Sequence, residues 1–316
     1  MTDLAAIAPQ AACPAAFALV ADLYSAVLSG RTANTLRAYQ GDIQDFARYL
    51  GSASPAAALD TLTGFSPAIA NACALSYRAH LADRGLAPAT IARRLAALRS
   101  ACKVARMLGR IGWEIEVESP SAESYRDTSG PGRDGWTAML ALAKARATTK
   151  AGKRDLAIVR LLHDTALRRC EAVELDVSDL DLRRATISVR GKGHTSTAPI
   201  TLPGPTKAAL ADWLCIRGDD PGPLFNPLDK DGGYGRLSGE SVRRIVRDLG
   251  RAADLSRPVA PHGLRHQAIT HALDRTGGDV RAVRKFSRHA KLDTLVIYDD
   301  NRSDLAGGVA ALVADE

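Results

Sequence analysis

The chain has few cysteines and few aromatic residues, and both shortages narrow the classes of protein to which it can belong. Its five cysteines are scattered over 316 residues without a C-x-x-C pair. An odd number at irregular spacing argues against a disulfide framework and a zinc site, and it is typical of a reducing compartment. Aromatic residues make up only 5% of the chain. Together with abundant alanine, this favours helices over a β-sandwich.

Long hydrophobic runs are also missing. The longest apolar run, Ala11 to Ala21, is too short to cross a bilayer, and Asp3 stands where a signal peptide carries basic residues. We therefore expect a soluble, cytoplasmic protein without a membrane partner. The chain is 46% hydrophobic and 24% charged, as globular proteins are, and its length suggests two domains. The net charge of +7 suits a polyanionic partner but does not identify one.

The N-terminal part shows the periodicity of amphipathic helices. Apolar residues recur at spacings of three and four from Leu36 to Leu50, with Asn34 or Thr35 available as the N-cap. A second helix is expected over about 67–84 and a third from residue 88 onward. These patterns predict an all-helical N-terminal domain.

Acidic residues are absent from residues 84–113, a stretch with seven basic ones. On the third expected helix, positions 99, 103, 106 and 110 recur at i, i+4, i+7 and i+11 and therefore share a face. Solvated helices usually mix charges of both signs, so an unmixed basic face predicts contacts with DNA phosphates. The alternative is a basic helix that is merely exposed. The predicted DNA-binding residues are Arg37, Arg93, Arg94, Arg99, Lys103, Arg106 and Arg110.

The composition changes after residue 111, where glutamates cluster before Ser129-Gly-Pro-Gly132. Such a stretch between helical blocks is typical of a linker. We therefore expect an N-terminal domain over residues 1–115, a linker over 116–134 and a second domain over 135–316. The second domain should contain helices at about 135–147 and 154–165, short strands at 185–190 and 198–202, and further helices from residue 206. The predicted fold class is mainly α with a small antiparallel β-sheet in an α+β second domain.

The last part of the chain concentrates residue types that suit phosphoryl transfer. His262 and Arg265 form an H-x-x-R motif, His289 follows, and Tyr298 lies nine residues after His289. Arginine binds phosphate in a bidentate manner, histidine moves protons, and tyrosine can attack phosphorus and hold it covalently. Each of these residues has an ordinary structural explanation when taken alone. Their joint order and spacing are far more specific.

Upstream of this motif, Arg168 lies in Thr165-Ala-Leu-Arg and Lys192 lies in Gly191-Lys-Gly193. With these two residues included, the chain closely resembles the tyrosine recombinase (phage integrase) family. The resemblance implies that Arg168 and Arg265 bind the scissile phosphate and that Lys192 protonates the departing 5′ oxygen. It further implies that His262 takes the proton of the nucleophile Tyr298 and that His289 hydrogen-bonds the phosphate. Glu171 matches an acidic position that supports the first arginine.

The same resemblance implies the reaction and the partners. A helical core-binding domain and a catalytic domain would form a C-shaped clamp on double-stranded DNA that carries a specific recombination site. A homotetramer in the synaptic complex, with accessory DNA-bending proteins where needed, would integrate, excise or transpose a mobile element through a 3′-phosphotyrosine, without metal or nucleotide cofactor. Two alternatives stay open: a type IB topoisomerase with the same chemistry, and a non-catalytic DNA-binding relative.

Two motifs depart from the family pattern. Ala166 replaces the glycine of the usual Thr-Gly-Leu-Arg, so this turn must accommodate a Cβ atom. Ser287-Arg288-His289 replaces the usual Leu-Gly-His, and Arg288 either reaches phosphate or is an exposed substitution. Of the other histidines, we expect packing or local hydrogen bonding for His266 and His271, a structural role for His163, and a contact with backbone phosphate for His194.

Overall fold

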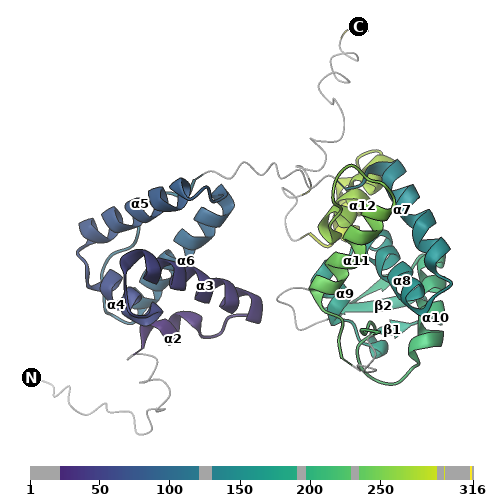
Figure 1. Cartoon of the computed structure of the whole chain (residues 1–316), viewed down its shortest axis with the longest axis horizontal. Coiled ribbons are helices and arrows are strands. Elements are labelled where there is room, and N and C mark those ends of the chain that lie inside the picture. Colours follow the sequence, from purple (N-terminus) through teal and green to yellow (C-terminus); the bar gives the residue numbers. More distant parts are fainter. Residues whose placement is uncertain are drawn as a thin grey trace, which may run out of the picture. The chain divides into compact units, whose positions relative to one another are not determined.

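The computed structural model describes residues 22–120, 130–190, 197–228 and 235–289, together with Leu295 and Ala314. The chain divides into two compact units, Met1–Arg126 and Asp127–Glu316, and each is described by itself (Figure 1). Within the described ranges the chain is mainly helical, and the second unit contains a small antiparallel sheet. The predicted fold class is therefore confirmed.

The described part of the first unit is all helical. Its elements are α2 (Leu23–Leu28), α3 (Ala33–Leu50), α4 (Pro55–Gly64), α5 (Pro67–Asp83) and α6 (Pro88–Met107). Prolines begin the last three of these helices, at positions where the missing N–H costs no helical hydrogen bond. The predicted N-cap of α3 is wrong. Thr32 caps this helix by accepting from the N–H of Thr35, and Asn34 already lies inside the helix.

All five helices of the first unit contribute buried residues to its core. Phe46 and Tyr77 are fully buried, and their rings meet edge to face at a centroid distance of 5.0 Å. Leu95 and Leu98 of α6 pack into the same cluster, and so does Val117 from the segment that follows α6. The apolar stripe read from the sequence is thus the buried side of these helices.

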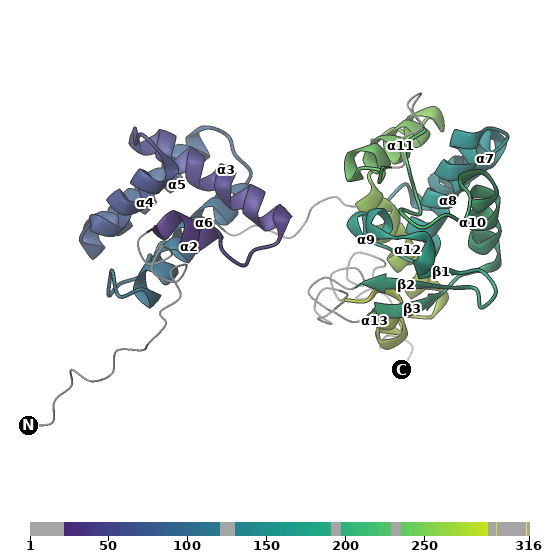
Figure 2. The ribbon, with the colours of Figure 1, turned by 90° about the horizontal axis from the view of Figure 1, so that it is seen from below.

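The second unit combines helices with a short antiparallel sheet. Its helices are α7 (Gly132–Arg146), α8 (Lys150–Asp164), α9 (Arg169–Glu174), α10 (Gly204–Arg217), α11 (Gly239–Ala252), α12 (Pro261–Arg275) and α13 (Val280–Ser287), with a short 3₁₀ turn, η2 (Val177–Asp179). The strands are β1 (Leu180–Asp181), β2 (Thr186–Arg190) and β3 (Thr197–Thr201), in the antiparallel order β1-β2-β3. Figure 2 shows this sheet away from α7 and α11. β1 escaped prediction because two residues give no alternation to read.

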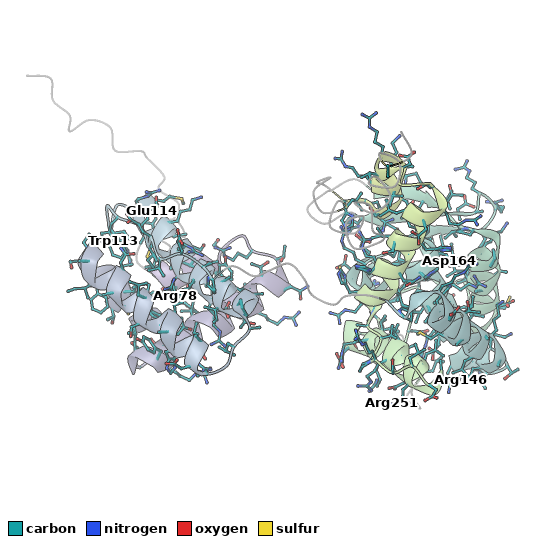
Figure 3. All side chains as sticks on the ribbon, turned by 90° about the horizontal axis from the view of Figure 1, so that it is seen from above. Arg78, Trp113, Glu114, Arg146, Asp164 and Arg251 are labelled. Carbon is teal, nitrogen blue, oxygen red and sulfur yellow. The ribbon has the colours of Figure 1, made fainter. Side chains whose placement is uncertain are left out.

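Helix α8 lies at the centre of the second unit, where α7, α10 and α12 pack against it. It ends at Asp164, which Figure 3 labels. The carboxylate of Asp164 lies 2.9 Å from Nδ1 of His163 and accepts from the Thr206 hydroxyl at 2.6 Å. Trp136 stacks on the ring of His163 at 3.8 Å. His163 is therefore packed and locally hydrogen-bonded, as predicted, and these contacts fix the end of α8 just before the turn that leads to Arg168.

Candidate active site

The predicted phosphate-binding residues are arranged around a buried turn between α8 and α9. Ala166, in the middle of this turn, is fully buried and has φ +47°. Glycine adopts this left-handed conformation readily, whereas alanine adopts it at a cost. The methyl group belongs to an apolar cluster that includes Leu273, Val283 and Leu295. The expectation that this turn accommodates a Cβ is confirmed.

Arg265 projects from α12 into the interior and is 2% exposed. Its Nη1 donates to the carbonyl oxygen of Ala166, and its Nη2 donates to the carbonyl oxygen of Ser287 at 2.5 Å. Nη2 also lies 3.2 Å from Nε2 of His289. The side chain therefore joins the turn before α9 to the end of α13, and it brings the two sequence motifs together.

Arg168 is the N-cap residue of α9 and is held by Glu171. The backbone N–H of Arg168 donates to Glu171 Oε2 at 2.8 Å, and Nη1 donates to Oε1 at the same distance. Burial alone would raise the pKa of Glu171, but these hydrogen bonds and the charge of Arg288 outweigh it and hold the pKa below its usual 4.5. Glu171 is thus ionised and orients Arg168, whose side chain remains 33% exposed.

His289 follows α13 and faces Arg265. Its Nδ1 lies 3.0 Å from the hydroxyl oxygen of Ser287. Burial, followed by the charges of Arg265 and Arg168, lowers the pKa of His289 to about 4. The imidazole is therefore neutral at physiological pH. Because Arg265 can only donate, Nε2 of His289 accepts in this arrangement and Nδ1 carries the proton.

Arg288, the residue at which the family pattern is broken, is turned toward the interior. It is the C-cap of α13, with φ 56° and ψ 39°, and its side chain is 19% exposed. The guanidinium donates to the carbonyl oxygens of Thr165 and Ala166 and to the carboxylate of Glu171. The sequence suggested that Arg288 either reaches phosphate or is an exposed substitution. Neither expectation included these contacts with the buried turn and with Glu171.

The remaining predicted catalytic residues are not all within the described part of the chain. His262 is exposed in the first turn of α12, and its charge contributes to lowering the pKa of His289. Lys192 and His194 lie in the sequence between β2 and β3, whose ends pair through Arg190 and Thr197, and both are outside the described residues. Tyr298 is also outside them.

Two other histidines on α12 were expected to pack or to bond locally. His266 is partly buried, and its Nδ1 lies 3.4 Å from the hydroxyl oxygen of Thr270. His271 is exposed.

The convergence shown by the structure is therefore that of Arg168, Arg265 and His289, with Glu171 and Arg288 behind them.

In the first unit, two predicted DNA-binding residues are held by buried carboxylates. Asp42 and Asp45 of α3 are each 3% exposed. Arg93 pairs with Asp42, and Arg94 pairs with both aspartates. Arg84 completes the network with two hydrogen bonds to Asp45, at 3.0 and 3.1 Å. These pairs could not be predicted from charge patterning, because the two aspartates lie about fifty residues before Arg93 and Arg94 in the chain.

The predicted basic face of α6 is also partly engaged. Arg99 donates to the carbonyl oxygen of Val117 at 2.8 Å and to the hydroxyl of Ser119 at 2.6 Å. Arg106 pairs with Glu114, which Figure 3 labels, and Arg110 lies 3.3 Å from Asp60. Arg37 bonds Asn34 within α3. Lys103 is exposed and meets no partner among the described residues. A DNA contact stays a prediction for all seven residues, and Lys103 is the one most available for it.

Across the described ranges, no helix is both long and apolar enough to span a membrane. A search of the same residues finds no group of three or more histidine, cysteine or acidic side chains placed to bind a metal ion.

The comparisons with known proteins agree in both units. The model of the phage integrase family matches residues 137–304, and that of the phage integrase N-terminal SAM-like domain matches residues 21–107. A tyrosine recombinase of Synechococcus elongatus is 42% identical over 283 residues, 88% of each chain. A tyrosine recombinase of Synechocystis is 38% identical, over 90% of this chain and 92% of the relative. Tyrosine recombinase XerC of Mycobacterium tuberculosis is 30% identical, over 88% and 91%.

Solved structures share the fold. A post-cleavage complex of the XerH site-specific recombinase matches with a TM-score of 0.68 and 19% identity, over 89% of this chain and 80% of the other. The Tn1549 transposon integrase with transposon right-end DNA matches with a TM-score of 0.69 and 15% identity, over 94% and 99%.

A helical unit followed by an α+β unit with clustered arginines and histidines defines a DNA-breaking and rejoining enzyme of the tyrosine recombinase type. The chain belongs to the phage integrase family.

Proposed function

We propose that the chain recombines DNA at a specific site through a 3′-phosphotyrosine formed on Tyr298. The observation that carries this proposal is the convergence of Arg168, Arg265 and His289 around the turn at Ala166. Two cations and a neutral imidazole, backed by one buried carboxylate, form a site for a singly charged phosphodiester.

The two arginines suit a phosphate whose charge rises during the reaction. Glu171 accepts from Nη1 of Arg168, while the other side-chain N–H groups of Arg168 meet no acceptor among the described residues. Arg265 is fixed by two backbone carbonyl oxygens. Guanidinium groups held in this way neutralise the non-bridging oxygens of a pentacoordinate transition state without reorganising when it forms.

His289 can serve as a donor to the phosphate by changing tautomer. In the structure its Nδ1 faces the hydroxyl of Ser287, which can either accept from or donate to it. When a phosphate lies beside Arg265, the Ser287 hydroxyl donates to Nδ1, and Nε2–H points to a phosphate oxygen. Without a bound phosphate, burial and the charges of the neighbouring arginines lower the pKa of His289 to about 4, so the imidazole is neutral before DNA binds.

The proposed reaction conserves the energy of the phosphodiester bond. The phenol oxygen of Tyr298 attacks phosphorus while its proton passes to His262. The bond to the 5′ oxygen breaks, and Lys192 gives that oxygen a proton, which leaves a 5′-hydroxyl. The 5′-hydroxyl of a partner strand then attacks the phosphotyrosine and releases Tyr298. No nucleotide cofactor is needed, because each bond broken is replaced by one of similar energy.

The proposed partner is double-stranded DNA bound by both units as a clamp. The structure of XerH contains the palindromic difH substrate, and that of lambda integrase is a dimer on a COC′ core site. We infer the same kind of partner for this chain, with four protomers bringing two sites together and accessory DNA-bending proteins assisting where a site requires them. Integration, excision or transposition of a mobile element is the biological role we propose.

Covalent trapping on a nicked duplex tests the proposal. A binding site would be selected from random DNA and nicked next to each candidate cleavage position, so that the short 5′-hydroxyl fragment diffuses away after cleavage. The proposal predicts an SDS-resistant protein–DNA band on one strand of one sequence. Binding without any covalent band would support a non-catalytic protein, and relaxation of plasmids that lack the site would support a topoisomerase.

A further inference from the structure

We propose that Arg288 is a positioning residue that sets Arg168 and His289 relative to each other. Its guanidinium links the end of α13 to the turn at Ala166 and to Glu171. The inference rests on the proposed function, because the geometry that Arg288 fixes is that of the phosphate-binding cluster.

The contacts of Arg288 span two walls of the site. Nη1 lies 3.1 Å from the carbonyl oxygen of Thr165 and 3.3 Å from that of Phe286. Nη2 lies 3.1 Å from the carbonyl oxygen of Ala166 and 3.1 Å from Oε2 of Glu171. One planar group therefore holds a backbone turn and a carboxylate that lie more than a hundred residues earlier in the chain.

Glu171 transmits this contact to Arg168. Its Oε2 accepts from both Nη2 of Arg288 and the backbone N–H of Arg168, and its Oε1 accepts from Nη1 of Arg168. A displacement of Arg288 would therefore move the carboxylate that orients Arg168. On the other side, Arg288 is the chain neighbour of His289, so the same residue places both groups.

A direct phosphate contact suits Arg288 less well than this role. Its two terminal nitrogens already have four protein acceptors, and its Nε is buried. Its guanidinium also pairs at 3.1 Å with Glu171, a carboxylate that it shares with Arg168. Arg168, in contrast, has a more exposed side chain with N–H groups available.

The backbone conformation gives a second, independent reason to treat Arg288 as a positioning residue. Ala166 and Arg288 both hold left-handed conformations, with φ 47° and 56°, and glycine is the residue that favours them. Neither position is glycine, yet the two residues are joined directly by the hydrogen bond from Nη2 of Arg288 to the carbonyl oxygen of Ala166. Side-chain contacts thus stabilise a turn geometry that glycine would otherwise provide.

Arg288→Gly is the discriminating variant, because glycine keeps the left-handed C-cap of α13 and removes only the side-chain contacts. Cleavage of pre-bound DNA should slow by about ten- to a hundred-fold, the effect expected for a modest misplacement of reacting groups. DNA affinity should stay close to that of the parent, and the unfolding midpoint is measured beside it because the carbonyl oxygens of Thr165 and Ala166 also lose a donor. The matched control is Arg281→Ala, on the same helix, where Arg281 is exposed and has no partner among the described residues.

The Glu171→Gln variant, alone and combined with Arg288→Gly, tests whether Arg288 acts through Glu171. If Arg288 acts through Glu171, the double variant should cleave no more slowly than the slower single variant, whereas independent effects would multiply. If Arg288→Gly lowers the unfolding midpoint, Arg288→Lys decides instead, since lysine keeps the charge but cannot reach four acceptors at once.

Parent-like cleavage by Arg288→Gly, or by Arg288→Lys where that variant decides, would overturn the inference, and so would multiplicative effects in the double variant. A parent protein that forms no covalent adduct would instead contradict the proposed function. The two failures are therefore distinguishable.

Discussion

Nη2 of Arg265 lies 3.2 Å from Nε2 of His289, so a buried guanidinium directly faces a neutral imidazole. Two donors placed side by side at a scissile phosphate would repel each other if both were charged. Burial and the charge of Arg265 avoid this by keeping His289 neutral. The consequences of this pair can be tested without knowing the DNA site.

The first prediction is that His289 makes the protein less stable in mild acid. Its folded-state pKa of about 4 lies below its ordinary 6.5, so the unfolded chain binds more protons between these values. The free energy of unfolding should therefore fall as the pH drops from 6.5 to 4. In His289→Gln this fall should be smaller, as measured by denaturant unfolding across that range. His271→Gln, at an exposed position on α12, is the control, and an unchanged pH dependence in His289→Gln would contradict the assignment.

A second prediction separates the two arginines. Arg168→Ala should slow cleavage by a factor on the order of 10²–10³ through lost transition-state stabilisation, with little change in stability because the side chain is partly exposed. Arg265→Ala should slow cleavage at least as much and also lower the free energy of unfolding by about 1–3 kcal/mol. The added loss arises because the carbonyl oxygen of Ser287 loses its buried donor and that of Ala166 keeps only the one from Arg288. Equal stability of the two variants would be inconsistent with this account.

The third prediction concerns the ion-pair network of the first unit. Burial would raise the pKa of Asp45, but hydrogen bonds from Arg84 and Tyr77 and the charge of Arg94 lower it overall. Asp45→Ala removes the carboxylate that accepts from Tyr77, Arg84, Arg94 and Arg48, and it should destabilise the unit by about 3 kcal/mol or more. Asp60→Ala is the control, because Asp60 is an exposed partner of Arg110 and should matter by less than about 1 kcal/mol. Thermal unfolding of the full chain measures the stability of both variants. If Asp45→Ala were no more destabilising than Asp60→Ala, the ion-pair network would contribute little to the stability of the first unit.

The fourth prediction is that Lys103 contacts a DNA phosphate. Lys103→Ala should weaken binding to all sequences alike and flatten the slope of log K against log salt by about 0.9. Cleavage of pre-bound DNA should change little. Lys144→Ala, at an exposed site on α7, is a control outside the predicted contacts. An unchanged slope for Lys103→Ala would place this face of α6 away from DNA.

Much of the fold could be predicted because its signals are local. The stripe that includes Phe46 and the strands on either side of Lys192 follow from periodicities read over a few residues. The turn at Ala166 was predictable as a strained position, since its place in the motif normally holds glycine.

What escaped prediction depends on contacts between distant residues. The acid-free run suggested an unmatched basic face, yet Arg93 and Arg94 find their carboxylates on α3, about fifty residues earlier in the chain. Arg288 contacts a turn more than a hundred residues away. Charge patterning within one helix gives no information on partners supplied by another element, so only the folded chain shows which cations are engaged.

Identifying the residue that carries the DNA decides whether Tyr298 is the nucleophile. The covalent adduct would be trapped on the nicked duplex, digested with trypsin and nuclease, and its nucleotide-bearing peptide sequenced by mass spectrometry. The account predicts a phosphodiester on Tyr298, and Tyr298→Phe should bind the same DNA with unchanged affinity yet give no adduct. A nucleotide on any other residue, or an SDS-resistant adduct formed by Tyr298→Phe, would contradict it.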